Sequence, residues 1–410
     1  MKKSLIITIV CFVVGIVVLA GGFILLTDNE ISRSIFTTTT TAAPKPEPIP
    51  TPEYKKFDFF KENLSEWITL GQYKGLTVGV NQLKVSESDI DMEIHIDLCQ
   101  NDVYTKQFEG KIKEKEIFSF DFTGYLLKDD GTRDKAFDNG AGKNQLAYID
   151  GNDLVTLTVG STELGGFIDG FAQGMLGMSV DETKTLDITF PEDYHSADMA
   201  GKKVEFDVKI NHIAKTTFDG ATASYISNKK YTTVQAYRDY VRKELEDALK
   251  QQNNQSVLLE VLNNITIVAS TEKQNEYVFG MLCSTIEYYV EYYSSFGYKV
   301  TFGDMLKQLG FDSVDALTKY SEEYAKSESG ILEIKSQILP YALIAAEDIA
   351  VTDDDYKKFI ADEVESSKKT EAEIVEMYGG EEVIKQIILL DKAEARLLEI
   401  IENENTCIKK

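Results

Sequence analysis

Histidine and cysteine are scarce in this chain of 410 residues, and the sequence uses them without pattern. No two histidines stand at the spacing of metal ligands, and no CxxC pair occurs, so neither a zinc site nor a disulfide framework is predicted. We expect no metal and no other cofactor. The residues concerned are His95, His195, His212, Cys11, Cys99, Cys283 and Cys407.

Basic residues are also in deficit. The chain has 43 Lys and Arg against 68 Asp and Glu, which gives a formal net charge of −25. Binding to nucleic acid depends on clustered Lys and Arg that neutralise phosphates. Nucleic acid is therefore not an expected partner, and the negative charge favours solubility through self-repulsion.

One long hydrophobic run stands at the start of the sequence. Lys2 and Lys3 precede residues 5–26, which contain no charged residue. At about 1.5 Å per residue, a helix of this length spans roughly 33 Å, enough to cross a hydrocarbon core of about 30 Å. We predict a transmembrane signal anchor at 5–26, with residues 1–4 cytoplasmic and the bulk of the chain extracytoplasmic in a single-pass cell-membrane protein. A cleaved signal peptide is the alternative, because small residues at 20–22 resemble a cleavage site.

Proline is concentrated in the segment that follows, residues 27–54. Five of the seven prolines lie here, after five consecutive threonines at 37–41. Such a composition cannot bury a core and favours extended polyproline II structure. We interpret this segment as a spacer between the membrane and the folded part.

The remaining sequence divides by pattern into an adaptor at 55–110, a strand-rich segment at 111–215, a helical segment at 216–404 and a polar tail at 405–410. Apolar and polar residues alternate at 118–122, 154–159, 185–190 and 204–210, with turn sequences at 129–131, 138–140 and 150–152. Apolar residues recur at helical spacing after residue 231. The predicted fold class is α+β, with an antiparallel sheet followed by an all-α region.

Helix boundaries are also readable. Ser86 and Thr352 each precede acidic residues in the pattern of an N-cap, and Gly379-Gly380 separates two late helices. Aromatic residues crowd positions 288–298, where helical spacing cannot place all of them on one face. They indicate either an ordinary packed bundle or an exposed surface that binds apolar segments.

Several motifs of the strand-rich segment resemble, in order, the FKBP-type peptidyl-prolyl isomerase domain of the trigger factor family. They are Phe120–Gly124 (FDFTG), Phe137-Asp138, Phe167–Phe171 (FIDGF), Phe190–His195 (FPEDYH) and Ala200–Val208. Tyr73–Leu76 and Ile349–Asp355 resemble the flanking parts of that family. The resemblance implies an FKBP-like sheet wrapped on a short helix, followed by the helical C-terminal domain of trigger factor. No ribosome-binding loop of the family is found, so ribosome binding is not expected.

By this resemblance, the isomerase site would be an aromatic pocket. Its catalytic residues would be Phe122, Phe137, Asp138, Phe167, Ile168, Phe171, Tyr194 and Phe206, and Met199, Val155 and Leu157 would contact the substrate. The chain departs from the family at Asp169, where proline is usual, and is longer than usual between Gly160 and Gly170.

The predicted function is that of an extracytoplasmic peptidyl-prolyl cis-trans isomerase and folding chaperone. Its partners would be unfolded or nascent exported polypeptides, together with the membrane through the N-terminal helix. One alternative is a catalytically inactive holdase that binds unfolded chains through its helical arms. Another is a surface adhesive protein on a Thr/Pro stalk.

Overall fold

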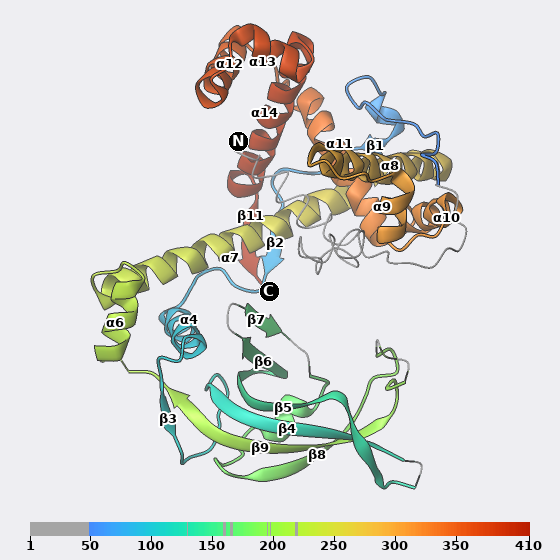
Figure 1. The fold of residues 1–410 in the computed structure, drawn as a ribbon. Coiled ribbons are helices and arrows are strands. Elements are labelled where there is room, and N and C mark those ends of the chain that lie inside the picture. Colours follow the sequence, from blue (N-terminus) through green and yellow to red (C-terminus); the bar gives the residue numbers. More distant parts are fainter. Residues whose placement is uncertain are drawn as a thin grey trace. The chain divides into compact units, whose positions relative to one another are not determined.

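Two compact units make up the computed structural model, which describes residues 49–128, 130–158, 161–164, 167–194, 196, 198–217 and 220–410. Lys84–Leu249 form one unit, called here the sheet unit. The described residues up to Leu83 and the segment Lys250–Lys410 form the other, called the helical unit. The sheet unit is therefore inserted in sequence into the helical unit (Figure 1).

This division differs from the predicted linear order of pieces. The predicted adaptor at 55–110 separates at Leu83, and residues 220–249 of the predicted helical segment belong to the sheet unit. The predicted tail contains a strand, β11 (Thr406–Lys409). Sequence periodicity reports local structure only, so it does not reveal which distant segments pack together.

The predicted anchor at 5–26 and most of the predicted spacer lie outside the described residues. Within the described ranges, no helix combines the length and the apolar character that a bilayer crossing requires. Residues 49–54 were predicted to belong to the spacer, but Ile49 and Tyr54 pack against the core of the helical unit.

The sheet unit contains an antiparallel sheet, as the alternating pattern predicts, and the sheet has seven strands. The strand order is β3-β9-β4-β5-β6-β7, and β8 pairs with β9. The strands are β3 (Thr105–Gln107), β4 (Phe118–Leu127), β5 (Arg133–Asp150), β6 (Asp153–Thr158), β7 (Ser161–Leu164), β8 (Thr183–Thr189) and β9 (Lys203–Lys215).

The turn predicted at 138–140 is wrong, because these residues lie inside strand β5. Thr123 of β4 pairs with Ala141 of β5, and Tyr125 pairs with Ala136. A stretch two residues long in β4 therefore faces a stretch five residues long in β5, so β5 bulges at this point. Glycine and asparagine suit a bulge as well as a turn, and sequence alone does not separate the two. Of the other two predicted turns, residues 130–131 lie between β4 and β5, and residues 151–152 lie between β5 and β6.

Each face of the sheet packs against a different helix. On one face, α5 (Phe171–Met175) packs on a core that includes Phe118 and Phe120. On the other face, Ile96 and Cys99 of α4 (Glu87–Gln100) contact the sheet. The opposite side of α4 packs against α6 (Gly220–Asn228) and the first half of α7 (Val234–Asn264).

The helical unit surrounds one large core of aliphatic and aromatic side chains, and a smaller cluster joins its last helices. The caps predicted at Ser86 and Thr352 are confirmed as capping boxes. The elements of this unit other than α7 and β11 are a 3-10 turn η2 (Leu64–Glu66), β1 (Ile68–Thr69), β2 (Thr77–Val80), β10 (Thr266–Ile267), α8 (Thr271–Ser295), α9 (Phe302–Gln308), α10 (Val314–Tyr324), α11 (Glu328–Ala346), α12 (Asp353–Ser367), α13 (Glu371–Tyr378) and α14 (Glu381–Asn403).

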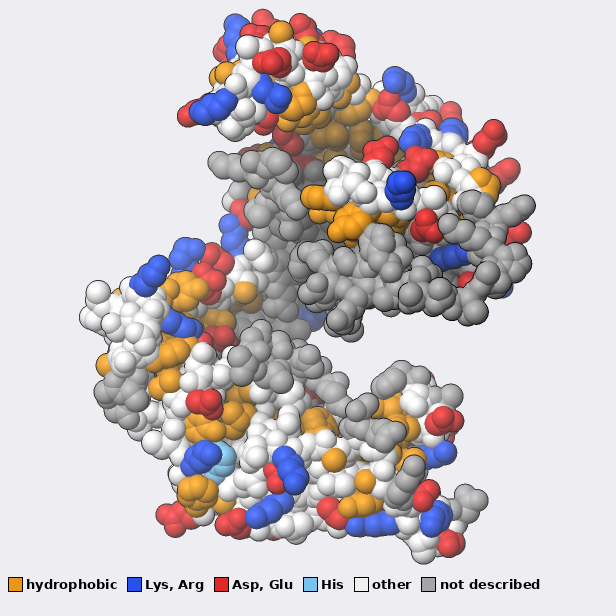
Figure 2. Space-filling view, viewed as in Figure 1, with side chains coloured by type: hydrophobic (Ala, Val, Ile, Leu, Met, Phe, Trp, Pro, Cys, Tyr) orange, Lys and Arg blue, Asp and Glu red, His pale blue; other side chains and the backbone are white. Residues whose placement is uncertain are grey.

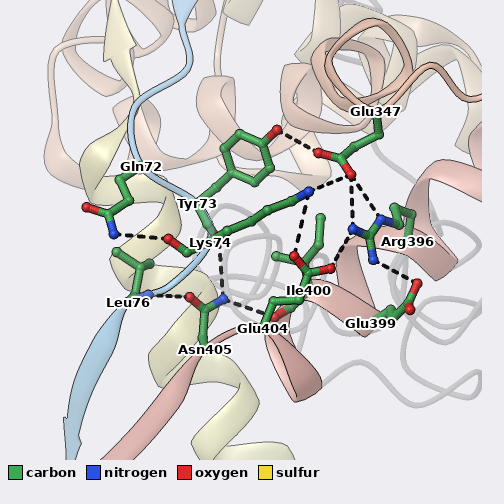
Figure 3. Close-up of polar contacts among 10 residues, drawn as sticks. All are labelled: Gln72, Tyr73, Lys74, Leu76, Glu347, Arg396, Glu399, Ile400, Glu404 and Asn405. Atoms are coloured by element: carbon green, nitrogen blue, oxygen red, sulfur yellow. Dashed lines mark hydrogen bonds and ion pairs between the residues drawn. The ribbon is translucent and has the colours of Figure 1, made fainter.

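Parallel pairing of β2 with β11 joins the two sequence halves of the helical unit. Beside this pair, Figure 3 shows Glu347 at the centre of a polar network. Its carboxylate accepts hydrogen bonds from Tyr73 (2.6 Å), Lys74 (2.7 Å) and Arg396 (3.1 Å). Burial alone would raise the pKa of Glu347, but these hydrogen bonds outweigh it and lower the pKa to about 2.

We predict that Glu347→Ala destabilises the helical unit by at least about 2 kcal/mol, because a single hydrogen bond to a charged group is worth roughly 1.5–3 kcal/mol and Glu347 accepts three that do not add fully. The folded-state pKa lies below the unfolded one, so the contribution of Glu347 is present above about pH 4.5 and is lost as the pH falls towards 2. Urea denaturation at pH 7 and pH 3 measures both effects. The control is Glu399→Ala, an exposed residue that pairs with Arg396 alone and should cost less than about 1 kcal/mol. Equal losses from the two variants would contradict the prediction.

Candidate active site

Aromatic rings converge on the face of the sheet that α5 covers. The Phe171 ring lies 4.4 Å from Phe167, 5.0 Å from Phe206 and 6.0 Å from Phe122, measured between centroids. Most of these contacts are edge-on, the arrangement that aromatic quadrupoles favour. Phe137 adds a fifth ring at 5.9 Å from Phe206.

The rings come from different strands and from helix α5, and the backbone of each element fixes the position of its ring. Phe122 and Phe206 lie on β4 and β9, and Phe171 is the first residue of α5. The helix begins after Gly170, whose φ of 91° is one that a residue with a side chain rarely adopts. Gln173 donates to the backbone and side-chain oxygens of Asn152, which fixes α5 against the turn between β5 and β6.

Glycines leave room for the rings. A Cβ atom on Gly142 would lie 2.5 Å from the Phe122 ring, and one on Gly124 would lie 2.5 Å from Phe137 and 2.6 Å from Phe206. No real Cβ contact is this short, so these positions require glycine for the observed ring placement. The bulge in β5 lies opposite Gly124 in the pairing register, between Ala136 and Ala141, and contains Phe137.

The structure brings most of the predicted site residues together. Phe171 and Phe206 are buried in one core with half-buried partners: Phe122, Phe137, Phe167, Ile168, Tyr194 and Met199. The Asp138 backbone lies in the bulge beside Phe137, and its side chain is outside the described part of the structure. The catalytic roles of these residues remain predictions.

Val155 and Leu157 do not join this cluster. In β6 they alternate with Leu154, which packs on the α5 side, so they point to the opposite face of the sheet. Leu157 packs against Ile96 of α4. The prediction that Val155 and Leu157 contact the substrate beside the aromatic rings is therefore corrected. The sequence located strand β6, but it did not show which of its side chains point towards the rings.

Sequence reasoning missed two rings of the cluster. Phe120 lies 5.7 Å from Phe122, and Phe190 lies 6.1 Å from Phe137 and 4.6 Å from Tyr194. Both belong to motifs that carried the family resemblance. Alternation along β4 was the available signal, because Phe118, Phe120 and Phe122 share one face.

Charged side chains lie on the face of β9 opposite to Phe206. Asp207 and Glu205 alternate with Phe206 and pair with Arg133, whose guanidinium lies 2.6 Å from Asp207. The hydrogen bond from Arg133 holds the pKa of Asp207 below its usual range. Among the residues that the structure describes, no group of three or more His, Cys, Asp or Glu could hold a metal ion.

An apolar, aromatic surface of this kind suits a reaction that needs desolvation. Rotation about an X–Pro bond has a barrier of about 18–20 kcal/mol, set by amide resonance. The twisted amide is less polar than the planar one, so a dry aromatic surface favours the twisted state.

Comparison with known proteins agrees with this chemistry. Residues 109–211 match the family described as FKBP-type peptidyl-prolyl cis-trans isomerase. These residues include β4 to β8, α5 and most of β9. The sheet unit therefore contains an FKBP-type peptidyl-prolyl cis-trans isomerase domain.

Over a longer range the chain is similar to trigger factors. It is 25% identical to trigger factor of Macrococcus caseolyticus over 333 residues, which are 80% of this chain and 70% of that protein. It is 33% identical to that of Desulforamulus reducens over 209 residues, 50% of this chain and 42% of that protein. A solved trigger factor chaperone structure covers 82% of this chain and 73% of its own, at 12% identity and a TM-score of 0.28, too low to argue from. The chain is thus similar to trigger factors over most of its length and contains an FKBP-type isomerase domain.

We predict that Gly142→Ala lowers kcat/KM for prolyl isomerisation by about tenfold to a hundredfold. The new methyl group must displace the Phe122 ring, and small misplacements at a reacting centre cost up to about a hundredfold. A coupled proline-peptide assay measures the effect. The control is Leu157→Ala, which removes a buried side chain from the opposite face. It should lower the melting temperature and leave kcat/KM of the folded protein unchanged. A Gly142→Ala variant with the kcat/KM of the wild type would contradict the assignment of this surface.

Proposed function

We propose that the chain is an extracytoplasmic peptidyl-prolyl cis-trans isomerase and folding chaperone for exported polypeptides. The observation that carries this proposal is the convergence of Phe122, Phe167, Phe171 and Phe206 on one apolar face within the isomerase domain. No nucleophile is required, because the enzyme only has to favour the twisted amide over the planar one.

In this mechanism Phe171 forms the floor on which the proline ring of the substrate packs. Phe122, Phe167 and Phe206 form walls that exclude water, and Tyr194 lies on the loop beside Phe190. The Ile168 amide would donate to the substrate backbone, and Asp138 would face the carbonyl group that turns. These roles follow from the family resemblance and the placement of the rings.

The chaperone part of the proposal rests on α8 and the segment after it. Tyr288, Tyr292 and Phe296 are 61%, 46% and 64% exposed, and neighbouring rings along the helix lie 5.1–6.3 Å apart. Tyr289 and Tyr293 pack against the core instead. Figure 2 shows hydrophobic side chains reaching the surface of the helical unit among charged ones. The rings of this stretch are therefore divided between the core and the surface, and the exposed rings are the ones that we propose bind apolar segments.

The location outside the cytoplasm is supported by sequence alone. Residues 5–26 are long enough to cross a bilayer, Lys2 and Lys3 favour the cytoplasmic side, and a Pro-rich segment follows. Exported chains, emerging unfolded beside such an anchor, would be the clients.

An isomerase-inactive holdase is the second candidate. Asp169 stands where the family usually has proline, and the unusually long segment before Gly170 contains β7, which pairs with β6. These differences adjoin Phe167 and Ile168, so they bear on the site itself.

We predict that Phe167→Ala lowers kcat/KM of the full chain by about ten- to a hundredfold. Burying a Phe side chain is worth about 1.5–3 kcal/mol, and each 1.36 kcal/mol is tenfold in rate. Asp138→Ala should lower kcat with less effect on stability, since the residue lies in a bulge. A wild-type chain with no rate above background in the proline-peptide assay would leave the holdase as the function.

We predict that Tyr292→Ser combined with Phe296→Ser weakens the suppression of aggregation of an unfolded client, because it removes exposed aromatic surface from α8. Light scattering of a refolding protein measures this. The matched control is Met377→Ser, an exposed apolar residue of α13 that is 52% accessible. Unchanged suppression by the double variant would exclude this surface as the client site.

We predict that the intact chain is found in the membrane fraction and that protease added from outside the cell degrades residues 49–410. Replacing Val13 and Val17 by Asp should release the chain from the membrane, since charge at a helix centre costs about 2.5–3.5 kcal/mol each. Protection of the whole chain from external protease would contradict the extracytoplasmic location.

A further inference from the structure

An extended segment at the start of the described chain lies across the helical unit. Residues 49–56, called here the strap, adopt no regular secondary structure, and Ile49 and Tyr54 pack against the core. Phe57 and Phe59 follow and contact the Trp67 ring at 5.1 and 5.2 Å. The strap is thus the part of this segment that precedes the aromatic core.

Glycine stands at two places where the strap passes close to the helices. A Cβ atom on Gly280 of α8 would lie 2.2 Å from the Lys55 carbonyl oxygen, and one on Gly303 of α9 would lie 2.9 Å from Ile49. Gly280 lies in the interior of a 25-residue helix, where glycine is less favourable than alanine. The helices therefore carry glycine where a peptide backbone has to pass.

The hydrogen bonds and ion pairs of the strap come from its side chains, whereas its backbone makes only packing contacts at Gly280 and Gly303. In the described part of the chain, no backbone hydrogen bond joins residues 49–57 to the helices. The Tyr54 hydroxyl donates to Glu287, and Lys56 donates to the same carboxylate at 3.1 Å. Lys55 lies 3.7 Å from Glu276.

This mode of contact accepts proline. A sheet edge rejects proline because it requires N–H donors, whereas a surface that makes no backbone hydrogen bonds is indifferent to them. The strap itself contains Pro50 and Pro52, residues that favour an extended chain. Its two lysines match the acidic residues beneath it and the net charge of −25.

We propose that the strap occupies, within its own chain, a binding site for extended proline-containing segments of client polypeptides, and that such a segment binds by displacing it. The preferred client segment has an aromatic residue two positions after a proline and a basic residue two positions after the aromatic one, as in Pro52, Tyr54 and Lys56. The inference rests on the proposed function, since it names the segments that the helical unit would hold for an isomerase.

Competition between the strap and a free peptide tests the proposal. The probe is a fluorescein-labelled synthetic peptide with the sequence of residues 49–58, and fluorescence anisotropy measures its binding to the full chain. If the site binds this peptide at about 0.1 mM, a strap at an effective concentration of about 1 mM weakens that binding about tenfold. The released variant, Tyr54→Ala with Lys56→Ala, should therefore bind the peptide about tenfold more tightly than wild type.

Three controls locate the binding. Thr51→Ala with Glu53→Ala alters exposed strap residues and should leave the affinity at the wild-type value. Gly280→Ala in the released variant should abolish peptide binding, with circular dichroism and thermal melting confirming the fold. If that variant does not fold, Glu287→Lys should weaken binding, and a peptide carrying Lys56→Glu should restore it. Equal affinity of the released variant and wild type would overturn the proposal, as would binding that none of the surface variants changes.

An isomerase assay distinguishes a failure of the proposed enzyme function from a failure of the strap site. The released variant should keep wild-type activity on a short proline peptide, because the strap is not part of the isomerase domain. Peptide exchange without isomerase activity would refute the enzyme function and leave the strap site standing. Isomerase activity without peptide exchange would refute the strap site alone.

Discussion

The helical unit depends on the meeting of two segments that are more than 300 residues apart in the sequence. The Leu76 amide donates to the Asn405 side chain at 2.7 Å, across a separation of 329 residues, and β2 continues from there alongside β11. Closing a flexible loop of that length costs about 5 kcal/mol in chain entropy. The Glu347 network and the shared apolar core offset this cost. Helices α8 to α11 and the second half of α14 can pack as they do because both sequence halves supply the same core.

Within the sheet unit, the corresponding constraint is that one sheet packs against α5 on one face and against α4 on the other. Strand alternation sends Ala147 and Ile149 of β5 towards α5 and Leu146 and Tyr148 towards α4, so one strand supplies two different cores. The reactive surface lies on one side, and the contacts that hold α4 lie on the other. This separation allows the aromatic cluster to be assembled from rings on several strands while α4 is packed independently.

Local features of the fold could be predicted from the sequence, and long-range ones could not. Alternation located β4, β6, β8 and β9, and acidic residues after Ser86 and Thr352 located two helix starts. Motif order indicated the ring cluster. The facing of Val155 and Leu157 was not predictable, because buried residues occur on both sides of β6. The bulge at 137–140 has the composition of a turn, and the nesting of one unit inside the other leaves no local trace.

Because the sheet unit is inserted into the helical unit, its sequence is complete before that of the helical unit during synthesis. A polypeptide emerges from its amino-terminal side, so Lys84–Leu249 are all present before α8 to α14 exist. The isomerase domain can therefore fold while the helical unit still lacks most of its helices and the partner strand of β2. During that interval the first residues of the helical unit, including Trp67, have no core to enter. During that part of its synthesis, the start of the helical unit is therefore unfolded, like the clients that we propose for the protein.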